Sequence, residues 1–199
     1  MKKYLRLFRV KHYVKNFLIF VPAFFGEAIF NLNLLRSLII AFLCFSFTAS
    51  FIYIINDLKD CEQDRQHVVK KNRPIAAGEI TKPKALIIAT LLIIAAMVGI
   101  LWLGQWRITQ AFIYLLVYVI LNLIYSFYAK RIAIIDVLIL ASGFVIRILY
   151  GAAACTIWCS EWLILTIMAV SLYLGLGKRR NELINIQNGT TRHVLEKYT

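Results

Sequence analysis

The sequence predicts an all-α membrane protein, a polytopic bundle of about six transmembrane helices, and three observations support this. The chain of 199 residues is 61% apolar and only 17% charged, which is too apolar for a soluble domain. Its apolar runs are about 20 residues long, the length that crosses a hydrocarbon core of about 30 Å. Its basic residues lie in the short segments between these runs, as they do in cytoplasmic loops.

The predicted elements follow one another in a single domain, 1–199. Residues 1–16 are basic and aromatic, which indicates an amphipathic segment at the membrane surface. A polar motif loop at 56–83 separates the second span from the third, and a cytoplasmic tail at 178–199 ends the chain. The expected spans are 17–30, 34–55, 83–103, 110–128, 134–156 and 161–177.

Lysine and arginine residues are distributed unevenly among the loops. Twenty lie in the N-terminal segment, the stretch 59–84, the turn at 130–131 and the tail, whereas the alternate loops hold two. This asymmetry predicts that both termini are cytoplasmic, in the inner (plasma) membrane. The net charge of +13 is then a topology signal, and no nucleic acid partner is expected. All polar motifs fall on one membrane face, which favours a single site there.

Three carboxylates open the motif loop. On a helix, Asp60 and Asp64 lie at about −60° and −20° relative to Asp57, so all three share one face. Like charges this close repel one another unless a cation lies between them. Mg²⁺ is the best candidate, because it binds a few carboxylates together with substrate phosphates. The alternative is a solvated helix end with ordinary surface acids.

A cluster of cations closes the same stretch. Arg73, placed before the helix-stopping Pro74, has a planar group that can bind two phosphate oxygens at once. Lys70 is a further candidate for phosphate binding. Lys71 is explained as an ordinary loop cation, and His67 equally as a surface residue or as the partner of a ligand-binding group.

A second group of polar residues surrounds the start of the fifth span. Tyr125, Ser126 and Lys130 precede Asp136, a carboxylate near hydrocarbon that needs a partner. Arg147 follows eleven residues later, about 20° away on the same helical face. A cation in mid-span is costly unless it is paired or faces a polar cavity. The alternatives are a topology role for Lys130 and a structural role for Arg147, bonded to backbone carbonyls.

A third motif, Gly177-Lys178-Arg179-Arg180-x-Glu182-Leu183, follows the sixth span. It is not a P-loop, because Arg179 stands where a serine or threonine would bind Mg²⁺. The alternative to phosphate binding is a local ion pair between Glu182 and one of the two preceding cations, Lys178 or Arg179.

These motifs resemble a known family. Asn56-Asp57-x-x-Asp60-x-x-x-Asp64, with Arg73-Pro74-Ile75-Ala76-x-Gly78, resembles the first signature of the UbiA superfamily of intramembrane prenyltransferases. Within it, the chain is most similar to the branch of polyprenyl-phosphate (decaprenyl-phosphate) phosphoribosyltransferases. That similarity is carried by Val14-Lys15-Asn16, Tyr125-Ser126 with Lys130 and Asp136, Gly143-Phe144 through Arg147, and Gly177-Lys178-Arg179-x-x-Glu182-Leu183.

The resemblance implies a Mg²⁺-dependent transferase with a cavity that faces the cytoplasm. The implied reaction transfers a phosphoribosyl group from phosphoribosyl diphosphate to a polyprenyl phosphate and releases diphosphate. The implied partners are a polyprenyl lipid substrate, a phosphorylated water-soluble co-substrate and the membrane, and the resemblance is compatible with an oligomer. Because the family usually has nine spans, the resemblance also implies a C-terminally truncated chain.

The resemblance assigns roles by motif position. The expected metal ligands are Asp57, Asp60 and Asp64, and the expected catalytic residues are these three with Lys130 and Asp136. The expected substrate-binding residues are Lys15, Asn16, Asn56, Lys70, Arg73, Tyr125, Ser126, Arg147, Lys178 and Arg179. One alternative is an aromatic prenyltransferase that uses polyprenyl diphosphate and the same aspartates. Another is a non-catalytic membrane protein, such as a transporter or an inactive fragment.

Overall fold

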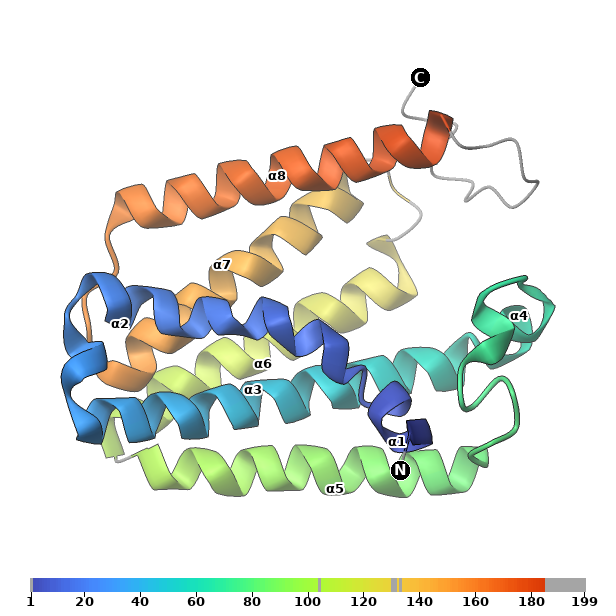
Figure 1. Ribbon diagram of the computed structural model, residues 1–199, viewed down its shortest axis with the longest axis horizontal. Helices are drawn as coiled ribbons and strands as arrows, with labels where there is room; N and C mark the ends of the chain where they lie inside the picture. Colours follow the sequence, from blue (N-terminus) through green and yellow to red (C-terminus); the bar gives the residue numbers. More distant parts are fainter. Residues whose placement is uncertain (1, 104, 130–131, 133, 185–199) are drawn as a thin grey trace.

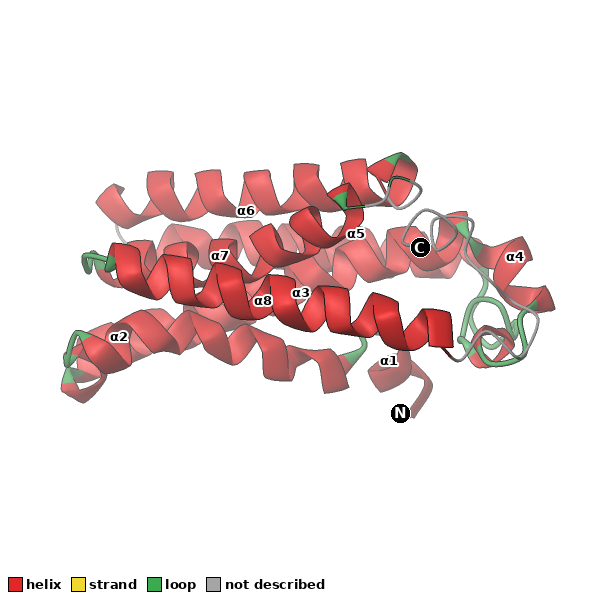
Figure 2. Ribbon diagram, turned by 90° about the horizontal axis from the view of Figure 1, so that it is seen from above, coloured by secondary structure: helices red, strands yellow, loops and turns green. Residues whose placement is uncertain are grey.

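The computed structural model describes residues 2–103, 105–129, 132 and 134–184, and these contain helices and no strands (Figure 1). The all-α prediction is therefore confirmed. Most helices run along one common axis, as the view from above also shows (Figure 2). In chain order the elements are α1 (Lys2–Leu7), the 3-10 helix η1 (Val10–Phe20), α2 (Val21–Phe25), η2 (Ala28–Phe30), α3 (Leu32–Lys59), α4 (Cys61–Gln66), η3 (Lys70–Asn72), α5 (Lys82–Ile100), η4 (Leu101–Leu103), α6 (Gln105–Phe127), α7 (Ile135–Cys155) and α8 (Glu161–Ile184).

Five helices in the described part of the chain are long and apolar enough to cross a membrane: α3, α5 with η4, α6, α7 and α8. They overlap the second to sixth expected spans, although α8 runs on past Gly177 to Ile184. In a bilayer an apolar run of this length satisfies its backbone polar groups by forming a helix. The chain is therefore an integral membrane protein.

The first expected span, 17–30, is not one continuous α-helix. It is divided among η1, the short helix α2 with Pro22 in its first turn, and a turn that begins at Gly26. Pro22 has no backbone N–H, so it suits the start of a helix and not its middle. Glu27 then adopts a left-handed conformation, with φ of 55°, and redirects the chain. Even so, η1 runs beside α3 and α7, and α2 packs against α7 (Figure 1).

The apolar core is built around α3. The ring of Phe45 contacts Tyr118 of α6 and Tyr150 of α7, with ring centroids 4.5 and 5.3 Å apart. Such offset or tilted aromatic pairs contribute about 0.5–1.5 kcal/mol beyond their area burial. Three helices that are distant in sequence are thus joined at one level of the bundle.

A second apolar cluster anchors the motif loop to the bundle. Ile75 and Ile80 of the loop pack against Ile54 of α3 and Leu7 of α1, and all four side chains are buried. Burial of a side chain of this size contributes about 1.5–3 kcal/mol. Because Ile75 is fixed in this way, Arg73 is held close to the end of α3.

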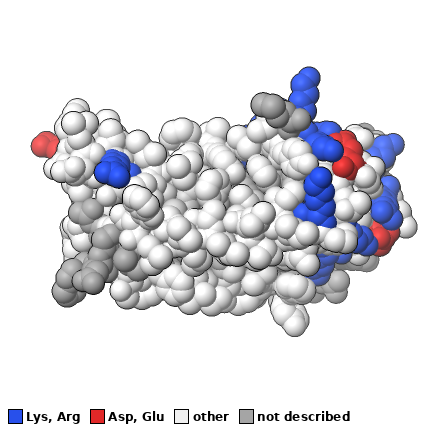
Figure 3. Space-filling view, turned by 90° about the horizontal axis from the view of Figure 1, so that it is seen from below, with Lys and Arg blue, Asp and Glu red and all other residues white. Residues whose placement is uncertain are grey.

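The charged residues gather at one end of the bundle (Figure 3). That end carries α4 and the motif loop, the N-terminal helix α1 and the C-terminal end of α8 (Figure 1). The uneven distribution of cations among the loops predicts this arrangement. The polar motifs found in the sequence therefore lie near one another at a single end.

Gly151 allows η1 to approach α7 closely. A Cβ atom added to Gly151 would lie 2.0 Å from the carbonyl oxygen of Ile19, which is far inside van der Waals contact. At Gly143, eight residues earlier on α7, an added Cβ would lie 3.5 Å from the guanidinium of Arg147, an ordinary contact. Of the two glycines on this face, Gly151 is the one that close packing requires.

We predict that Gly151→Ala lowers the free energy of unfolding by about 1–3 kcal/mol, because the new methyl group forces η1 away from α7. Thermal unfolding of the detergent-solubilised protein measures this. Gly177→Ala is the matched control, since no atom lies within 4 Å of an added Cβ there. Equal unfolding temperatures for the two variants would contradict the packing explanation.

Candidate active site

Two carboxylates of the motif loop, Asp57 and Asp64, remain on the same side of the chain across a helix junction. Asp57 lies in the last turn of α3, Asp64 lies in α4, and Asp60 lies between the two helices. The amide of Asp60 donates to the Asn56 carbonyl at 2.9 Å, and the amide of Asp64 donates to the Asp60 carbonyl at 2.8 Å. The helical hydrogen-bond pattern thus continues through the junction, as the predicted stripe requires.

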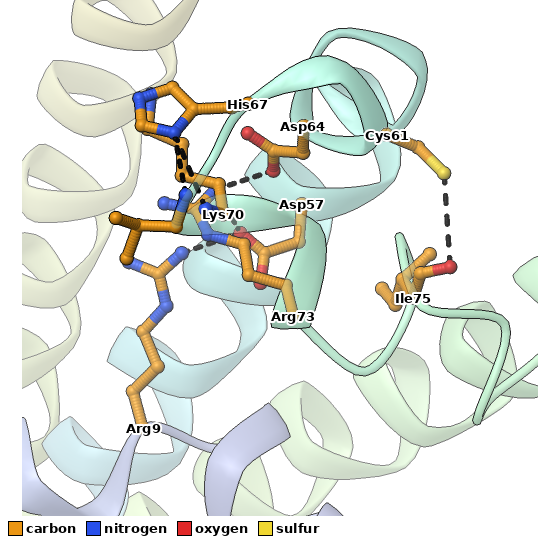
Figure 4. Close-up of polar contacts among 9 residues, drawn as sticks. Arg9, Asp57, Cys61, Asp64, His67, Lys70, Arg73 and Ile75 are labelled. Atoms are coloured by element: carbon orange, nitrogen blue, oxygen red, sulfur yellow. Dashed lines mark hydrogen bonds and ion pairs between the residues drawn. The ribbon is translucent and has the colours of Figure 1, made fainter. Parts of the chain in front are cut away.

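Arg73 bridges the two buried carboxylates. Its Nη1 donates to Asp57 Oδ1 at 3.0 Å and to Asp64 Oδ2 at 2.6 Å (Figure 4). Asp57 and Asp64 are only 2% and 3% exposed, whereas the Arg73 side chain is 28% exposed. Arg73 has an extended backbone before Pro74, with φ of −67° and ψ of 140°, as the X-Pro step predicts. The bridging cation therefore also reaches solvent.

Arg9 is a second cation at Asp57, and sequence reasoning missed it. Its Nη2 donates to Asp57 Oδ1, and its guanidinium carbon lies 4.7 Å from the centre of the Tyr53 ring. Arg9 has a φ of 52°, a left-handed conformation that turns the chain from α1 into η1. The predicted surface segment 1–16 is divided at this turn. In sequence, nothing distinguishes Arg9 from the other five cations of that segment. We call Arg9, Asp57, Asp64 and Arg73 the acidic cluster.

The neighbours of the acidic cluster have different roles. The Asn56 Oδ1 atom is buried without a hydrogen-bond partner in the structure. The His67 Nδ1 atom accepts backbone N–H groups of Val69 at 3.1 Å and Lys70 at 3.4 Å, which makes the imidazole a local turn cap. Lys71 is exposed, in keeping with an ordinary loop cation.

A shallow basic groove adjoins the acidic cluster at Arg73. It has a volume of about 270 Å³. Its lining residues are Arg6, Val69, Lys70, Asn72, Arg73 and Pro74. Arg6 also donates to both carboxylate oxygens of Glu79 at 2.7 Å, which fixes that side of the groove. Anion-binding side chains thus lie directly beside two buried carboxylates.

The donor chemistry of the acidic cluster fits a divalent cation. In the described part of the chain, no three His, Cys, Asp or Glu side chains converge as ready metal ligands. Instead, two guanidinium groups balance the two carboxylates. A hard cation such as Mg²⁺ needs only one or two protein carboxylates if phosphates and water supply the other ligands. The unpartnered oxygen of Asn56 adds a neutral donor nearby.

Asp136 and Arg179 form a buried ion pair between α7 and α8. The Arg179 Nε donates to Asp136 Oδ2 at 2.8 Å, and its Nη1 donates to Glu182 at 2.6 Å. The side chains of Asp136 and Arg179 are 1% and 3% exposed. The partner that Asp136 needs is thus Arg179. Of the two possible local ion pairs of Glu182, the structure forms the one with Arg179.

The second motif lies at the end of α6. The Ser126 hydroxyl donates to the Asn122 carbonyl at 2.7 Å, and the Ser126 carbonyl accepts from Lys59 Nζ at 2.8 Å. Tyr125 is half-buried beside it. The bond from Lys59 ties the end of α6 to the end of α3. The proposed catalytic residue Lys130 lies outside the described residues.

Arg147 is held by neutral groups. Its Nε donates to Asn16 Oδ1 at 2.9 Å and its Nη2 to the Tyr118 hydroxyl at 3.0 Å, while Nη1 donates to the Gly143 carbonyl. The Asn16 amide in turn donates to Ser46 Oγ at 2.9 Å. The backbone carbonyl contact agrees with the structural alternative for Arg147. Lys15 and Lys178, two other expected substrate-binding residues, form no ion pair with the acidic cluster.

The profile of the UbiA prenyltransferase family matches residues 18–177 of this chain. Among curated relatives, the chain is 37% identical to decaprenyl-phosphate phosphoribosyltransferase of Corynebacterium glutamicum, over 98% of this chain and 59% of the relative. It is 38% identical to the protein of the same name from Mycolicibacterium smegmatis, over 80% of this chain and 50% of the relative. The chain thus spans about half to three fifths of the length of these relatives.

A solved structure has the same fold. It is a UbiA homolog from Archaeoglobus fulgidus bound to GPP and Mg²⁺, and it superimposes with a TM-score of 0.69 at 22% sequence identity. The match covers 86% of this chain and 60% of the other. The described bundle therefore has the fold of the matched part of that homolog.

We predict that Asp136→Asn destabilises the protein by about 1–3 kcal/mol, because the buried Arg179 loses one of its two carboxylate partners and keeps only Glu182. The double variant Asp136→Asn/Arg179→Gln should recover much of the loss, since it buries no unpaired charge. Thermal unfolding in detergent compares the two. A double variant as unstable as Asp136→Asn would show that the pair is not what joins α7 to α8.

Proposed function

This chain belongs to the UbiA prenyltransferase family, and from its motif loop we propose a specific reaction for it. The protein transfers a phosphoribosyl group from phosphoribosyl diphosphate to a polyprenyl phosphate and releases diphosphate. The names of the relatives from Corynebacterium and Mycolicibacterium support this branch of the family. The chain spans only part of their length, so the reaction is proposed from the site that the chain itself contains.

The observation that carries the proposal is that Arg73 contacts the two buried carboxylates and also lines the basic groove. Its guanidinium touches Asp57 and Asp64 and also lines the basic groove. A diphosphate in that groove has cations on one side and carboxylates on the other, which is the arrangement that a metal-bridged diphosphate requires. Arg73 can turn from the carboxylates to the phosphate oxygens, because guanidinium forms paired hydrogen bonds with either.

Asp57 and Asp64, with Asp60 and Asn56 beside them, are the residues that would hold Mg²⁺. When bound, the metal supplies positive charge to the diphosphate leaving group. Arg73 and Lys70 bind the remaining phosphate oxygens and stabilise the charge that develops as the ribose C1–oxygen bond breaks. A phosphate oxygen of the lipid forms the new bond to C1. The protein supplies no nucleophile in this mechanism.

We also propose that the charged end of the bundle faces the cytoplasm, in the plasma membrane. The concentration of lysine and arginine at that end supports this orientation. A water-soluble diphosphate then enters from the cytoplasm, while the lipid arrives laterally from the bilayer. The expected catalytic roles of Lys130 and Asp136 remain part of this proposal. Asp136 would act indirectly, by fixing the position of Arg179 through their ion pair.

We predict that Asp57→Asn and Asp64→Asn each lower the rate of phosphoribosyl transfer by about a hundredfold or more, because each removes a charge that faces the diphosphate site. The assay incubates membranes with labelled phosphoribosyl diphosphate, a polyprenyl phosphate and Mg²⁺, and measures the labelled lipid. Glu62→Gln is the control. Glu62 is an exposed carboxylate of α4 that pairs with Arg65 and Lys82.

Two outcomes of this assay, and one outcome of a parallel assay with other substrates, would count against the proposal. Full activity of both aspartate variants would remove the motif loop from the site. Absence of labelled lipid from well-folded wild-type protein would reject the phosphoribosyl branch. Product formed from polyprenyl diphosphate and 4-hydroxybenzoate would favour an aromatic prenyltransferase.

A metal-removal experiment gives a separate prediction. Chelation with EDTA should abolish transfer, and Mg²⁺ should restore it, because the carboxylates otherwise stay paired with Arg9 and Arg73. Titration of Mg²⁺ into the chelated protein, followed by activity and by the unfolding temperature, measures both effects. Unchanged activity in EDTA would exclude a metal at the acidic cluster.

A further inference from the structure

Lys59 joins the end of α3, which carries Asp57, to the second motif at the end of α6. Its Nζ atom donates to the Ser126 carbonyl at 2.8 Å and lies 3.7 Å from the centre of the Phe127 ring. Both helices run toward the charged end of the bundle (Figure 1). Lys59 is neither a member of the acidic cluster nor one of the expected substrate-binding residues, so the proposed reaction leaves it without a role.

The last turn of α3 directs Asp57 and Lys59 to opposite sides of the helix. Residues two apart on an α-helix are separated by about 200° of rotation, so their side chains point away from each other. Asp57 pairs with Arg9 and Arg73 on one side. Lys59 reaches α6 on the other side. A single helical turn therefore contacts the motif loop and the second motif at the same time.

The groups that Lys59 contacts belong to a helix C-terminus. α6 ends at Phe127, and the last four carbonyls of an α-helix have no partner within the helix. The Ile124 carbonyl accepts from the Tyr128 amide at 2.9 Å, and the Ser126 carbonyl accepts from Lys59. A cation at this end of a helix also interacts favourably with the helix dipole. Lys59 thus caps α6 from a different helix.

The cap lies at a different level of the bundle from the aromatic core. The core contact between Phe45 and Tyr118 lies nine residues before Phe127, which is about 14 Å along α6. The Ser126 hydroxyl does not reach α3, because it donates to the Asn122 carbonyl within its own helix at 2.7 Å. The bond from Lys59 to the Ser126 carbonyl therefore ties α3 to α6 at the charged end itself.

We propose that Lys59 is a positioning residue, which holds the end of α6 at a fixed place relative to the carboxylates of α3. We call its contacts with Ser126 and Phe127 the lysine tie. The chain continues from Phe127 to Lys130 in three residues and to Asp136 in nine. Lys59 therefore sets the start of the segment that carries the second motif. Its effect on catalysis rests on the proposed function, whereas the lysine tie does not.

Steady-state kinetics of phosphoribosyl transfer, with the purified protein in nanodiscs, tests the positioning role. Lys59→Met removes the ammonium group and keeps an unbranched apolar side chain. The variant should fold, because Lys59 is exposed. Its kcat should fall about ten- to a hundredfold, since a displacement of about 1 Å in a catalytic group has an effect of this size. Its KM for phosphoribosyl diphosphate should change by less than about threefold, because the acidic cluster and the basic groove stay intact.

Two further variants separate positioning from a general loss of charge. Lys59→Arg should recover most of the wild-type kcat, because a guanidinium can also donate to a carbonyl and stack on the Phe127 ring. Lys71→Met removes an exposed lysine of the motif loop and is the matched control, with wild-type kinetics expected. A folded Lys59→Met variant with wild-type kcat overturns the positioning role, and so does a Lys59→Arg variant as slow as Lys59→Met.

Hydrogen exchange measures the lysine tie without the reaction. In Lys59→Met the backbone amides at the end of α6, such as that of Tyr128, should exchange about tenfold faster, because the last turn opens more often without its cap. Mass spectrometry of peptides that cover 122–128 detects this change, and peptides from the middle of α5 are the internal reference. Lys59→Arg should exchange like the wild type. Unchanged exchange at the end of α6 in Lys59→Met overturns the proposal.

These two measurements separate the lysine tie from the proposed function. If the wild-type protein forms no labelled lipid but the end of α6 exchanges faster in Lys59→Met, the proposed reaction fails and the lysine tie stands. If the wild type catalyses transfer and Lys59→Met has the same kcat and the same exchange, the positioning role fails and the reaction stands.

Discussion

Two buried carboxylates, Asp57 in the last turn of α3 and Asp64 in α4, need positive charge between them, and the arrangement of the motif loop depends on this requirement. Arg73 supplies the charge by bridging Asp57 and Asp64, and Arg9 adds a second guanidinium from the other side. The loop can hold Arg73 there because Ile75 and Ile80 are buried against α3. An apolar anchor and an ionic bridge thus fix one loop at two points, which leaves the Arg73 side chain partly open to solvent.

In the interior of the bundle, close packing positions one element, η1, and an ion pair helps to position another, α8. Gly151 lets the backbone of η1 contact α7, and this contact brings Asn16 to Arg147. On the other side of α7, the pair of Asp136 and Arg179 joins α8, which otherwise has mostly exposed apolar side chains. Close packing therefore sets the position of η1, whereas a buried ion pair contributes much to the position of α8.

The sequence predicted the parts of this structure that depend on local properties. Apolar length is enough to identify α3 and α5–α8, and helical spacing correctly places Asp57 and Asp64 on one side. For the first span, 17–30, the sequence indicates the interruptions at Pro22 and Gly26, but the path of the resulting short pieces depends on tertiary contacts with α3 and α7. Arg9 was missed for a related reason. Its role comes from a left-handed turn and a tertiary contact, neither of which leaves a mark in the sequence.

The members of the acidic cluster all lie within the first 73 residues, and this has a consequence for biogenesis. When Arg73 leaves the ribosome, Arg9, Asp57 and Asp64 have already been synthesised, while α5–α8 have not. Because chains are made from the N-terminus and early segments begin to fold during synthesis, the ionic bridges can form before most of the bundle has entered the membrane. Asp136 and Arg179 meet only after the insertion of α7 and α8. One part of the charged end is therefore assembled early in translation, and another part must wait for α8.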